Sequence, residues 1–509
     1  LSRRQRQMCI RDRSSGMAMA HWEIQGWMIL ILGWVFVPFY TRSMVYTMPE
    51  FLERRYNPQS RTILSVISLV SYVLTKVAVT VYAGGLVFQQ VFGIKELWGI
   101  DFFWIAAIGL VVLTALYTIF GGMKSVLYTS VLQTPILLLG SLIILVLGFK
   151  ELGGWDEMMR VCGAVTVNDY GDTMTNLIRS NDDANFPWLG ALIGSAIIGF
   201  WYWCTDQFIV QRVLSGKNEM EARRGTIFGA YLKLLPVFLF LIPGMIAFAL
   251  HQKYIGAGGE GFLPMLANGT ANADAAFPTL VAKLLPAGVK GLVVCGILAA
   301  LMSSLASLFN SSAMLFTIDF YKRFKPETPE KKLVGIGQIA TIVIVVLGIL
   351  WIPIMRSVGD VLYTYLQDVQ SVLAPGIAAA FLLGICWKRT SAQGGMWGLI
   401  SGMVIGLTRL GAKVYYSNAG EVADSTFKYL FYDMNWLFFC GWMFLFCIIV
   451  VIVVSLATEA PTAEKIQGLV FGTATKEQKA ATRASWNHWD IIHTVIILAI
   501  TAAFYWYFW

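Results

Sequence analysis

Ionisable and aromatic side chains lie inside long apolar stretches of this chain, where few such groups are expected. Residues 200–206 (FWYWCTD) combine aromatic rings with a carboxylate, and Lys233 lies in the next apolar stretch. A charge in hydrocarbon is costly, so such a residue usually faces a polar cavity and marks a binding site or an ion path. The pattern therefore predicts a transporter whose binding site lies within the bilayer.

Lys233 is the clearest candidate because of its depth. It follows Arg224, at the predicted cytoplasmic edge of its helix, by nine residues. At a rise of about 1.5 Å per residue this distance is about 14 Å, near the middle of a hydrocarbon core about 30 Å thick. Two interpretations remain open: a donor to substrate hydroxyls, or a lysine paired with a carboxylate for structure alone.

Other polar and aromatic residues share this predicted depth or lie at the outer mouth. Tyr202 and Trp203 offer flat rings of the kind that sugars stack on, although aromatic packing explains them too. Gln367 makes either an interhelical bond or a substrate contact. Glu23 lies at the outer end of its helix, where an interfacial carboxylate is also common.

Hydroxyl groups gather in the apolar stretch 289–320. Ser303 and Ser304 lie midway along it. Small polar residues also mark ordinary helix contacts, but a hard cation such as sodium needs several oxygens, which hydroxyls and backbone carbonyls supply. Asp206 and Asp319 lie nearer the cytoplasmic side and are interpreted as structural, while the carboxylate partner of Lys76 stays open.

Composition identifies a polytopic membrane protein. Of 509 residues, 57% are hydrophobic and 13% are charged, and the mean hydropathy is +0.65. A soluble domain has about 25% charged residues. The net charge of +8 is spread over loops, and the seven cysteines and four histidines show no metal-ligand spacing. No Walker A pattern is present, so transport would be driven by an ion gradient or would have no energy source.

The apolar stretches predict an all-α protein with about twelve membrane-spanning helices. These are residues 22–41, 61–92, 103–120, 126–149, 189–212, 225–250, 289–320, 333–355, 361–386, 393–411, 429–456 and 489–508. The stretch 277–286 is predicted to form a short surface helix that leads into the seventh span.

Loop charges predict the orientation, because Lys and Arg concentrate in cytoplasmic loops. This rule places residues 457–488 in a cytoplasmic loop and residues 150–188 in an extracellular loop, with residue 16 and the C-terminus also outside. The arginine-rich residues 1–15 would then lie outside against the rule, and they resemble translated adapter sequence. We expect residues 1–15 to be non-native and residues 16–509 to form a single transmembrane domain.

Three motifs resemble one transporter family. Residues 201–212 (WYWCTDQFIVQR), 229–236 (GAYLKLLP) and 300–311 (ALMSSLASLFNS) closely resemble sodium/glucose and sodium/galactose cotransporters of the solute:sodium symporter family. The resemblance extends from about residue 20 to residue 509. It implies a LeuT-like inverted-repeat core with peripheral helices. Family members have fourteen spans, so the resemblance implies that the first two are missing from this chain.

The resemblance also assigns residues to roles. It implies sodium ligands at the Ala300 carbonyl and at the Ser303 and Ser304 hydroxyls. The implied sugar contacts are Lys233, Gln367 and Trp203, with Tyr202 as an inner gate and with Glu23 or Gln25 in the place of the family's glutamate. Ser130 stands where the family has an aspartate linked to a second sodium, which favours one sodium per substrate.

The sequence thus predicts a symporter, not an enzyme, in the cytoplasmic or plasma membrane. It would carry a glucose- or galactose-like monosaccharide with sodium as the coupling ion, by alternating access, and would need no cofactor, nucleic acid or ATP. Its expected partners are sodium, the sugar and the lipid bilayer. Two alternatives stay open: symport of inositol or another small solute, and a sugar sensor or channel that does not concentrate its ligand. This chain, lacking two helices, is expected to be inactive.

Overall fold

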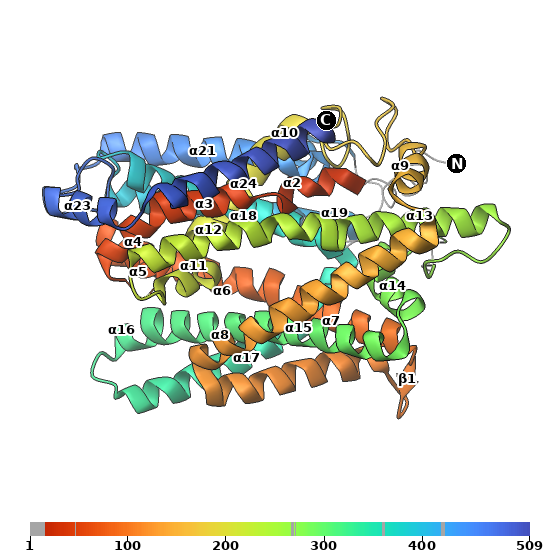
Figure 1. The fold of residues 1–509 in the computed structure, drawn as a ribbon. Coiled ribbons are helices and arrows are strands. Elements are labelled where there is room, and N and C mark those ends of the chain that lie inside the picture. The colour runs from red at the N-terminus through yellow and green to blue at the C-terminus, as the bar shows by residue number, and fades with distance from the viewer. Residues whose placement is uncertain (1–15, 46, 266–268, 270, 359–361, 419–422) are drawn as a thin grey trace.

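The computed structural model describes residues 16–45, 47–265, 269, 271–358, 362–418 and 423–509. These residues form a bundle of roughly aligned helices with a single short hairpin, as Figure 1 shows. The predicted all-α architecture is therefore confirmed. The stretch that we expect to be non-native, residues 1–15, lies outside the described residues, and its origin stays a prediction.

The first half of the chain contains the α-helices α2 (Ala20–Glu23), α3 (Gly26–Ile31), α4 (Val37–Ser43), α5 (Met48–Arg55), α6 (Pro58–Ser71), α7 (Ala78–Phe92), α8 (Phe102–Leu152), α9 (Trp155–Gly163), α10 (Trp188–Gly199), α11 (Gln207–Leu214), α12 (Glu219–Pro236) and α13 (Ile242–Gly256). The second half contains α14 (Ala276–Leu284), α15 (Ala287–Met314), α16 (Lys322–Phe324), α17 (Glu330–Val358), α18 (Leu362–Cys386), α19 (Ala392–Asn418), α20 (Thr426–Lys428), α21 (Trp436–Ala457), α22 (Ala463–Ile466), α23 (Lys476–Ala484) and α24 (His488–Tyr507). The strands β1 (Glu96–Leu97) and β2 (Ile100–Asp101) form the antiparallel hairpin.

Ten helical stretches in the described part are long and apolar enough to cross a membrane. They are Gly16–Ser43, Pro58–Phe92, Thr134–Leu152, Trp188–Thr205, Glu219–Gly256, Ala287–Phe324, Glu330–Pro353, Leu366–Cys386, Trp436–Ala457 and His488–Tyr507. The remaining two of the twelve predicted spans are also helical: the shorter apolar stretch Phe102–Leu116 and α19. The predicted surface helix before the seventh span is α14.

Helix α8 differs from the prediction, which separated spans 103–120 and 126–149. The chain stays helical throughout Phe102–Leu152. The two glycines at 121–122 lower helix propensity but keep their backbone N–H groups, so the helix need not end there. In Figure 1 the ribbon changes direction along α8. The end of α8 packs on α15 and α13, where Gly140 faces Val293 and Gly148 faces Ile246.

Several spans contain π-helical stretches, which insert an extra residue per turn and often occur at functional sites. They are Leu32–Phe36, Tyr72–Val77, Phe200–Thr205, Val237–Leu241, Leu315–Tyr321 and Tyr429–Asp433. The stretch Phe200–Thr205 is followed by a break, because Asp206 has an extended backbone with φ −79° and ψ 127°. The predicted span 189–212 is therefore two helices, α10 and α11, with the aromatic residues between them.

The two ends of the described chain lie at one end of the bundle. Figure 1 shows α9 and the C-terminus at that end and α23 at the opposite end. The backbone N–H of Met17 donates to the carbonyl of Met174 at 2.8 Å, and that of Leu177 donates to Phe508 at 2.9 Å. The predicted extracellular loop 150–188 is thus tied to both ends, and the predicted cytoplasmic loop 457–488 lies opposite. Which end faces the cytoplasm stays a prediction.

Candidate functional site

A cavity of about 200 Å³ lies where helices from distant parts of the sequence meet. It is lined by Trp22, Glu23, Gln25, Ile198, Gly199, Tyr202, Trp203, Lys233, Leu366, Gln367 and Gln370. All six residues that were predicted to contact the substrate are in this set: Glu23, Gln25, Tyr202, Trp203, Lys233 and Gln367. The structure therefore brings these residues together, while their role in binding remains a prediction.

The charged part of the cavity is an ion pair between two helices. The Lys233 Nζ on α12 lies 2.7 Å from the Glu23 Oε2 at the end of α2, and the two side chains are 15% and 22% exposed. The ammonium also lies 5.6 Å from the ring centroid of Trp203. An ammonium has three N–H donors, and Glu23 takes one. The ammonium thus has donor capacity left for a ligand in the cavity.

An amide holds the aromatic wall in place. The Gln25 side chain donates to the carbonyl of Ser195 at 2.9 Å and accepts from the Trp203 Nε1 at 3.3 Å. This amide fits against the helix because residue 199 is glycine: a Cβ there would lie 2.7 Å from the Gln25 Oε1. Gln25 is therefore both a cavity residue and the group that orients the Trp203 ring.

The π-helical stretch Phe200–Thr205 supplies two neighbouring rings to the cavity. The centroids of Tyr202 and Trp203 lie 5.0 Å apart in an edge-to-face arrangement. Both residues line the cavity, so this stretch supplies its aromatic surface.

Helix α18 contributes two amides from one face. Gln367 and Gln370 are three residues apart and both line the cavity. The Gln367 Oε1 is buried and finds no hydrogen-bond partner among the described residues. A buried acceptor without a partner is costly, and it suits a site where a ligand donates a hydrogen bond.

The predicted sodium ligands lie elsewhere, on α15. Ala300, Ser303 and Ser304 are on neighbouring positions of this helix, and none of them is among the residues that line the cavity. Ser303 is buried, and its carbonyl accepts a hydrogen bond from the Ser307 Oγ at 2.9 Å. In the part of the chain that the structure describes, no three His, Cys, Asp or Glu residues form a metal-binding group. The predicted ligands on α15 are hydroxyl and carbonyl oxygens.

Ser130, on which the predicted sodium stoichiometry depends, belongs to the part of α8 whose side chains lie outside the described residues. One sodium per substrate thus stays a prediction.

Sequence reasoning left the partner of Lys76 open, and the structure identifies it as Asp206. The two side chains form a buried ion pair, and the Tyr72 hydroxyl donates to the Asp206 Oδ1 at 2.7 Å. The Tyr202 ring centroid lies 4.8 Å from the Lys76 ammonium. Asp206 also accepts from the backbone N–H of Phe208 at 3.1 Å, so it caps α11. Asp206 thus stabilises the helix break between Thr205 and α11, which supports the structural role expected for it.

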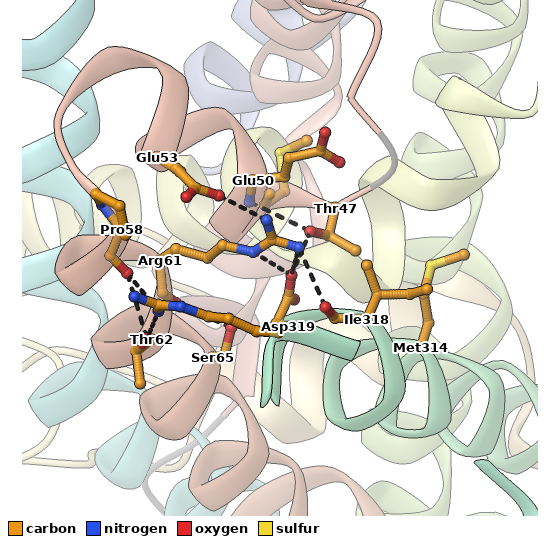
Figure 2. Close-up of polar contacts among 12 residues, drawn as sticks. Thr47, Glu50, Glu53, Pro58, Arg61, Thr62, Ser65, Met314, Ile318 and Asp319 are labelled. Atoms are coloured by element: carbon orange, nitrogen blue, oxygen red, sulfur yellow. Dashed lines mark hydrogen bonds and ion pairs between the residues drawn. The ribbon is translucent and has the colours of Figure 1, made fainter. Parts of the chain in front are cut away.

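A second ionic cluster, shown in Figure 2, involves Asp319. The Arg61 side chain donates to the Asp319 Oδ1 at 2.7 Å and to the Glu53 Oε2 at 2.6 Å. The Thr47 hydroxyl donates to the same Asp319 oxygen at 3.1 Å. These contacts join α5 and α6 to the end of the α15 span. They support the structural interpretation of Asp319, and its partners could not have been found from spacing alone.

Gln370 and Trp22 were not predicted to line the site. Gln370 had a usable signal, because it lies one helical turn after Gln367. No sequence signal pointed to Trp22, since a tryptophan at a helix end is also typical of the membrane interface.

A family profile, similar sequences and a solved structure all indicate a sodium-coupled symporter. The profile of the "Sodium:solute symporter family" matches residues 12–402. The sodium/mannose cotransporter of Bos taurus is 35% identical over 95% of this chain and 83% of its own length. The human sodium/myo-inositol cotransporter 2 is 35% identical over 90% of this chain and 69% of its own length. Sodium/glucose cotransporter 1 of Ovis aries is 37% identical over 85% of this chain and 67% of its own length.

The fold also has a solved counterpart. A Na+-coupled sialic acid symporter, solved in a substrate-bound outward-open state, aligns with a TM-score of 0.68 over 88% of this chain and 85% of its own. At 21% identity this likeness shows the fold alone, and it confirms the expected LeuT-like architecture. This multi-pass integral membrane protein is a transporter and not an enzyme, and it belongs to the sodium:solute symporter family.

Proposed function

We propose that this protein couples the entry of sodium to the uptake of a monosaccharide, by alternating access. The observation that carries the proposal is the cavity, where an ion pair, two aromatic rings and an unpartnered amide oxygen converge. Relatives named as sodium/mannose and sodium/glucose cotransporters support the substrate class.

Each part of the cavity matches one feature of a sugar. The Trp203 and Tyr202 rings offer an apolar surface for the C–H face of a pyranose. The Lys233 ammonium donates to a ring hydroxyl, and the Gln367 Oε1 accepts from another. The ammonium would then bond both Glu23 and the sugar, and the Glu23 carboxylate accepts a hydrogen bond from a further sugar hydroxyl. Gln25 accepts a hydrogen bond from the Trp203 indole, and it affects sugar binding by orienting that ring.

Sodium is proposed to bind on α15, at the Ala300 carbonyl and the Ser303 and Ser304 hydroxyls. Such oxygens suit a hard monovalent cation. If sodium stabilises the state that binds sugar, sugar must stabilise sodium binding by the same factor. One sodium per sugar, moving with a potential of 100 mV, supplies about 2.3 kcal/mol. We place the protein in the cytoplasmic or plasma membrane, where such a gradient exists.

A polyol is the second candidate substrate. The human sodium/myo-inositol cotransporter 2 is as similar in identity as the sodium/mannose cotransporter, at 35%. Inositol carries a hydroxyl on every ring carbon and has no ring oxygen, so it needs the same donors and acceptors. Competition by myo-inositol, mannose and galactose against labelled glucose ranks the candidates.

The test is uptake into proteoliposomes by the unmodified protein, expressed from the gene completed with its own upstream sequence. Labelled glucose is followed with and without an inward sodium gradient, for the unmodified protein and for Lys233→Ala. Lys253→Ala is the matched control, because its ammonium contacts the carbonyl of Leu152 outside the cavity. We expect accumulation above the outside concentration only with sodium, lost in Lys233→Ala and kept in Lys253→Ala.

Two results would contradict the proposal. Uptake that equilibrates but never exceeds the outside concentration would indicate a channel or sensor. Sodium-driven uptake that Lys233→Ala leaves unchanged would remove the cavity from the transport path.

A further inference from the structure

Helix α11 is joined to α15 by buried side-chain hydrogen bonds. The Gln211 Nε2 donates to the Ser311 Oγ at 2.7 Å and to the carbonyl of Ser307 at 3.3 Å. The Asn310 Nδ2 donates back to the Gln211 Oε1 at 3.3 Å. Gln211 is 6% exposed, and Ser307 and Ser311 are fully buried. One amide thus uses both its donor and its acceptor on the neighbouring helix.

The contact continues along the same face of α11. Gln207, one turn earlier, donates to the Met314 Sδ at 3.5 Å. Arg212 donates from its Nη2 to the Ser307 Oγ at 2.5 Å. These contacts run antiparallel along the two helices, so they fix both the register and the separation of α11 and α15.

Each of these helices is connected to one of the two proposed sites. Helix α11 continues, through the break at Asp206, from the π-helical stretch that carries Tyr202 and Trp203. Helix α15 carries the proposed sodium ligands, and the Ser307 Oγ that Arg212 touches donates to the carbonyl of Ser303 at 2.9 Å. Hydrogen bonds therefore lead from α11, which follows the aromatic stretch of the cavity, to the backbone of Ser303, one of the proposed sodium ligands.

We propose that Gln211 and Arg212 are positioning residues through which occupancy of the ion site on α15 sets the affinity of the cavity for sugar. This inference rests on the proposed function. Sodium at Ser303 and Ser304 would pull their oxygens toward the ion and add a positive charge near the Arg212 guanidinium. Because buried hydrogen bonds are kept or lost together, α11 would follow α15 between two arrangements. Tyr202 and Trp203 would move with α11.

The experiment measures the KM for labelled glucose at low and at saturating sodium, in proteoliposomes. Coupling between two sites typically changes an affinity about 5–150-fold. We expect a change in this range for the unmodified protein and a ratio close to 1 for Gln211→Leu and for Ser311→Ala. Ser311→Ala removes only a hydroxyl, so it tests the contact even if Gln211→Leu fails to fold.

Ser141→Ala is the matched control. Its hydroxyl is buried in α8 and has no hydrogen-bond partner among the described residues, so the KM ratio should equal that of the unmodified protein. A purely structural role of Gln211 would lower the amount of folded protein and the maximal rate, and would leave the ratio unchanged.

An unchanged ratio in both Gln211→Leu and Ser311→Ala would overturn the inference and leave the proposed function standing. A glucose KM that does not respond to sodium in the unmodified protein would overturn it too. Uptake by the unmodified protein that needs no sodium would instead overturn the proposed function, and this inference with it.

Discussion

The ion pair in the cavity and the ionic cluster of Figure 2 are built from similar groups and differ in the number of partners that the cation has. Lys233 meets one carboxylate, and both side chains stay partly exposed, at 15% and 22%. Arg61 meets two carboxylates, from Glu53 and Asp319, and its Nη2 also donates to the carbonyl of Ile318 at 3.3 Å. Asp319 is fully buried.

The number of partners distinguishes a cation that can bind a ligand from one that stabilises the fold. A cation with two carboxylates and a carbonyl gains little from a further partner, whereas an ammonium with one carboxylate beside a cavity has donors to offer. The number of partners, more than the presence of charge, therefore distinguishes the two regions. The following predictions test that distinction, from the largest expected effect to the smallest.

Replacing Lys233 should have the largest effect on transport. Lys233→Ala removes a charged hydrogen-bond donor, which typically contributes about 1.5–3 kcal/mol, and it removes the ammonium that pairs with Glu23. We expect kcat/KM for sugar to fall by about 10- to 150-fold, with little change in the thermal denaturation midpoint. A larger loss of stability than of transport would mean that the pair is structural.

Replacing Asp319 should lower the stability of the protein and have little effect on transport. Asp319→Asn removes one charge from a buried pair, and breaking such a pair typically costs about 3–5 kcal/mol. We expect a clearly lower denaturation midpoint in detergent and a sugar KM within about twofold of the unmodified value. Arg54→Ala is the control, because its pair with Glu50 is exposed and should contribute at most about 1 kcal/mol.

The unpartnered oxygen of Gln367 gives an intermediate effect. Gln367→Leu removes one neutral hydrogen bond to the ligand, which contributes about 0.5–1.5 kcal/mol, so the KM should rise about 2- to 10-fold. Uptake kinetics measure this change, with the exposed Gln393→Leu as control. An unchanged KM would mean that the ligand does not reach α18.

The smallest effect is expected at Gly199. In Gly199→Ala the new Cβ would lie 2.7 Å from the Gln25 Oε1, so Gln25 must shift and the Trp203 N–H loses its acceptor. Loss of this indirect contact should raise the sugar KM by about 2- to 5-fold, within the range of one neutral hydrogen bond. Gly225→Ala, where nothing lies within 4 Å of the Cβ, should leave the KM unchanged.

The helices and the cavity residues could both be predicted from the sequence. Apolar stretches indicate the helices, and polar residues within those stretches indicate the cavity. Lys233 and Gln367 stand out because each interrupts an apolar helix. Tyr202, Glu23 and Gln25 needed the motif resemblance as well, since aromatic or polar residues at those depths are common. That these residues share one cavity could not be derived from any single helix.

The missed features depend on contacts between distant segments. Lys76 and Asp206 are 130 residues apart, and Arg61 and Asp319 are 258 residues apart. No periodicity within one helix selects such a partner from several carboxylates. The break predicted within α8 was wrong because glycine lowers helix propensity without preventing a helix.

The π-helical stretch Phe200–Thr205 also has a consequence for chemical mapping of the transport path. An extra residue per turn rotates every later side chain relative to the earlier ones. Cysteines introduced singly along residues 189–214 should therefore react with a water-soluble thiol reagent in two separate periodic patterns. The phase should jump between Gly199 and Asp206, so a reactivity profile fitted with one helical period would assign the residues of α11 to the wrong face.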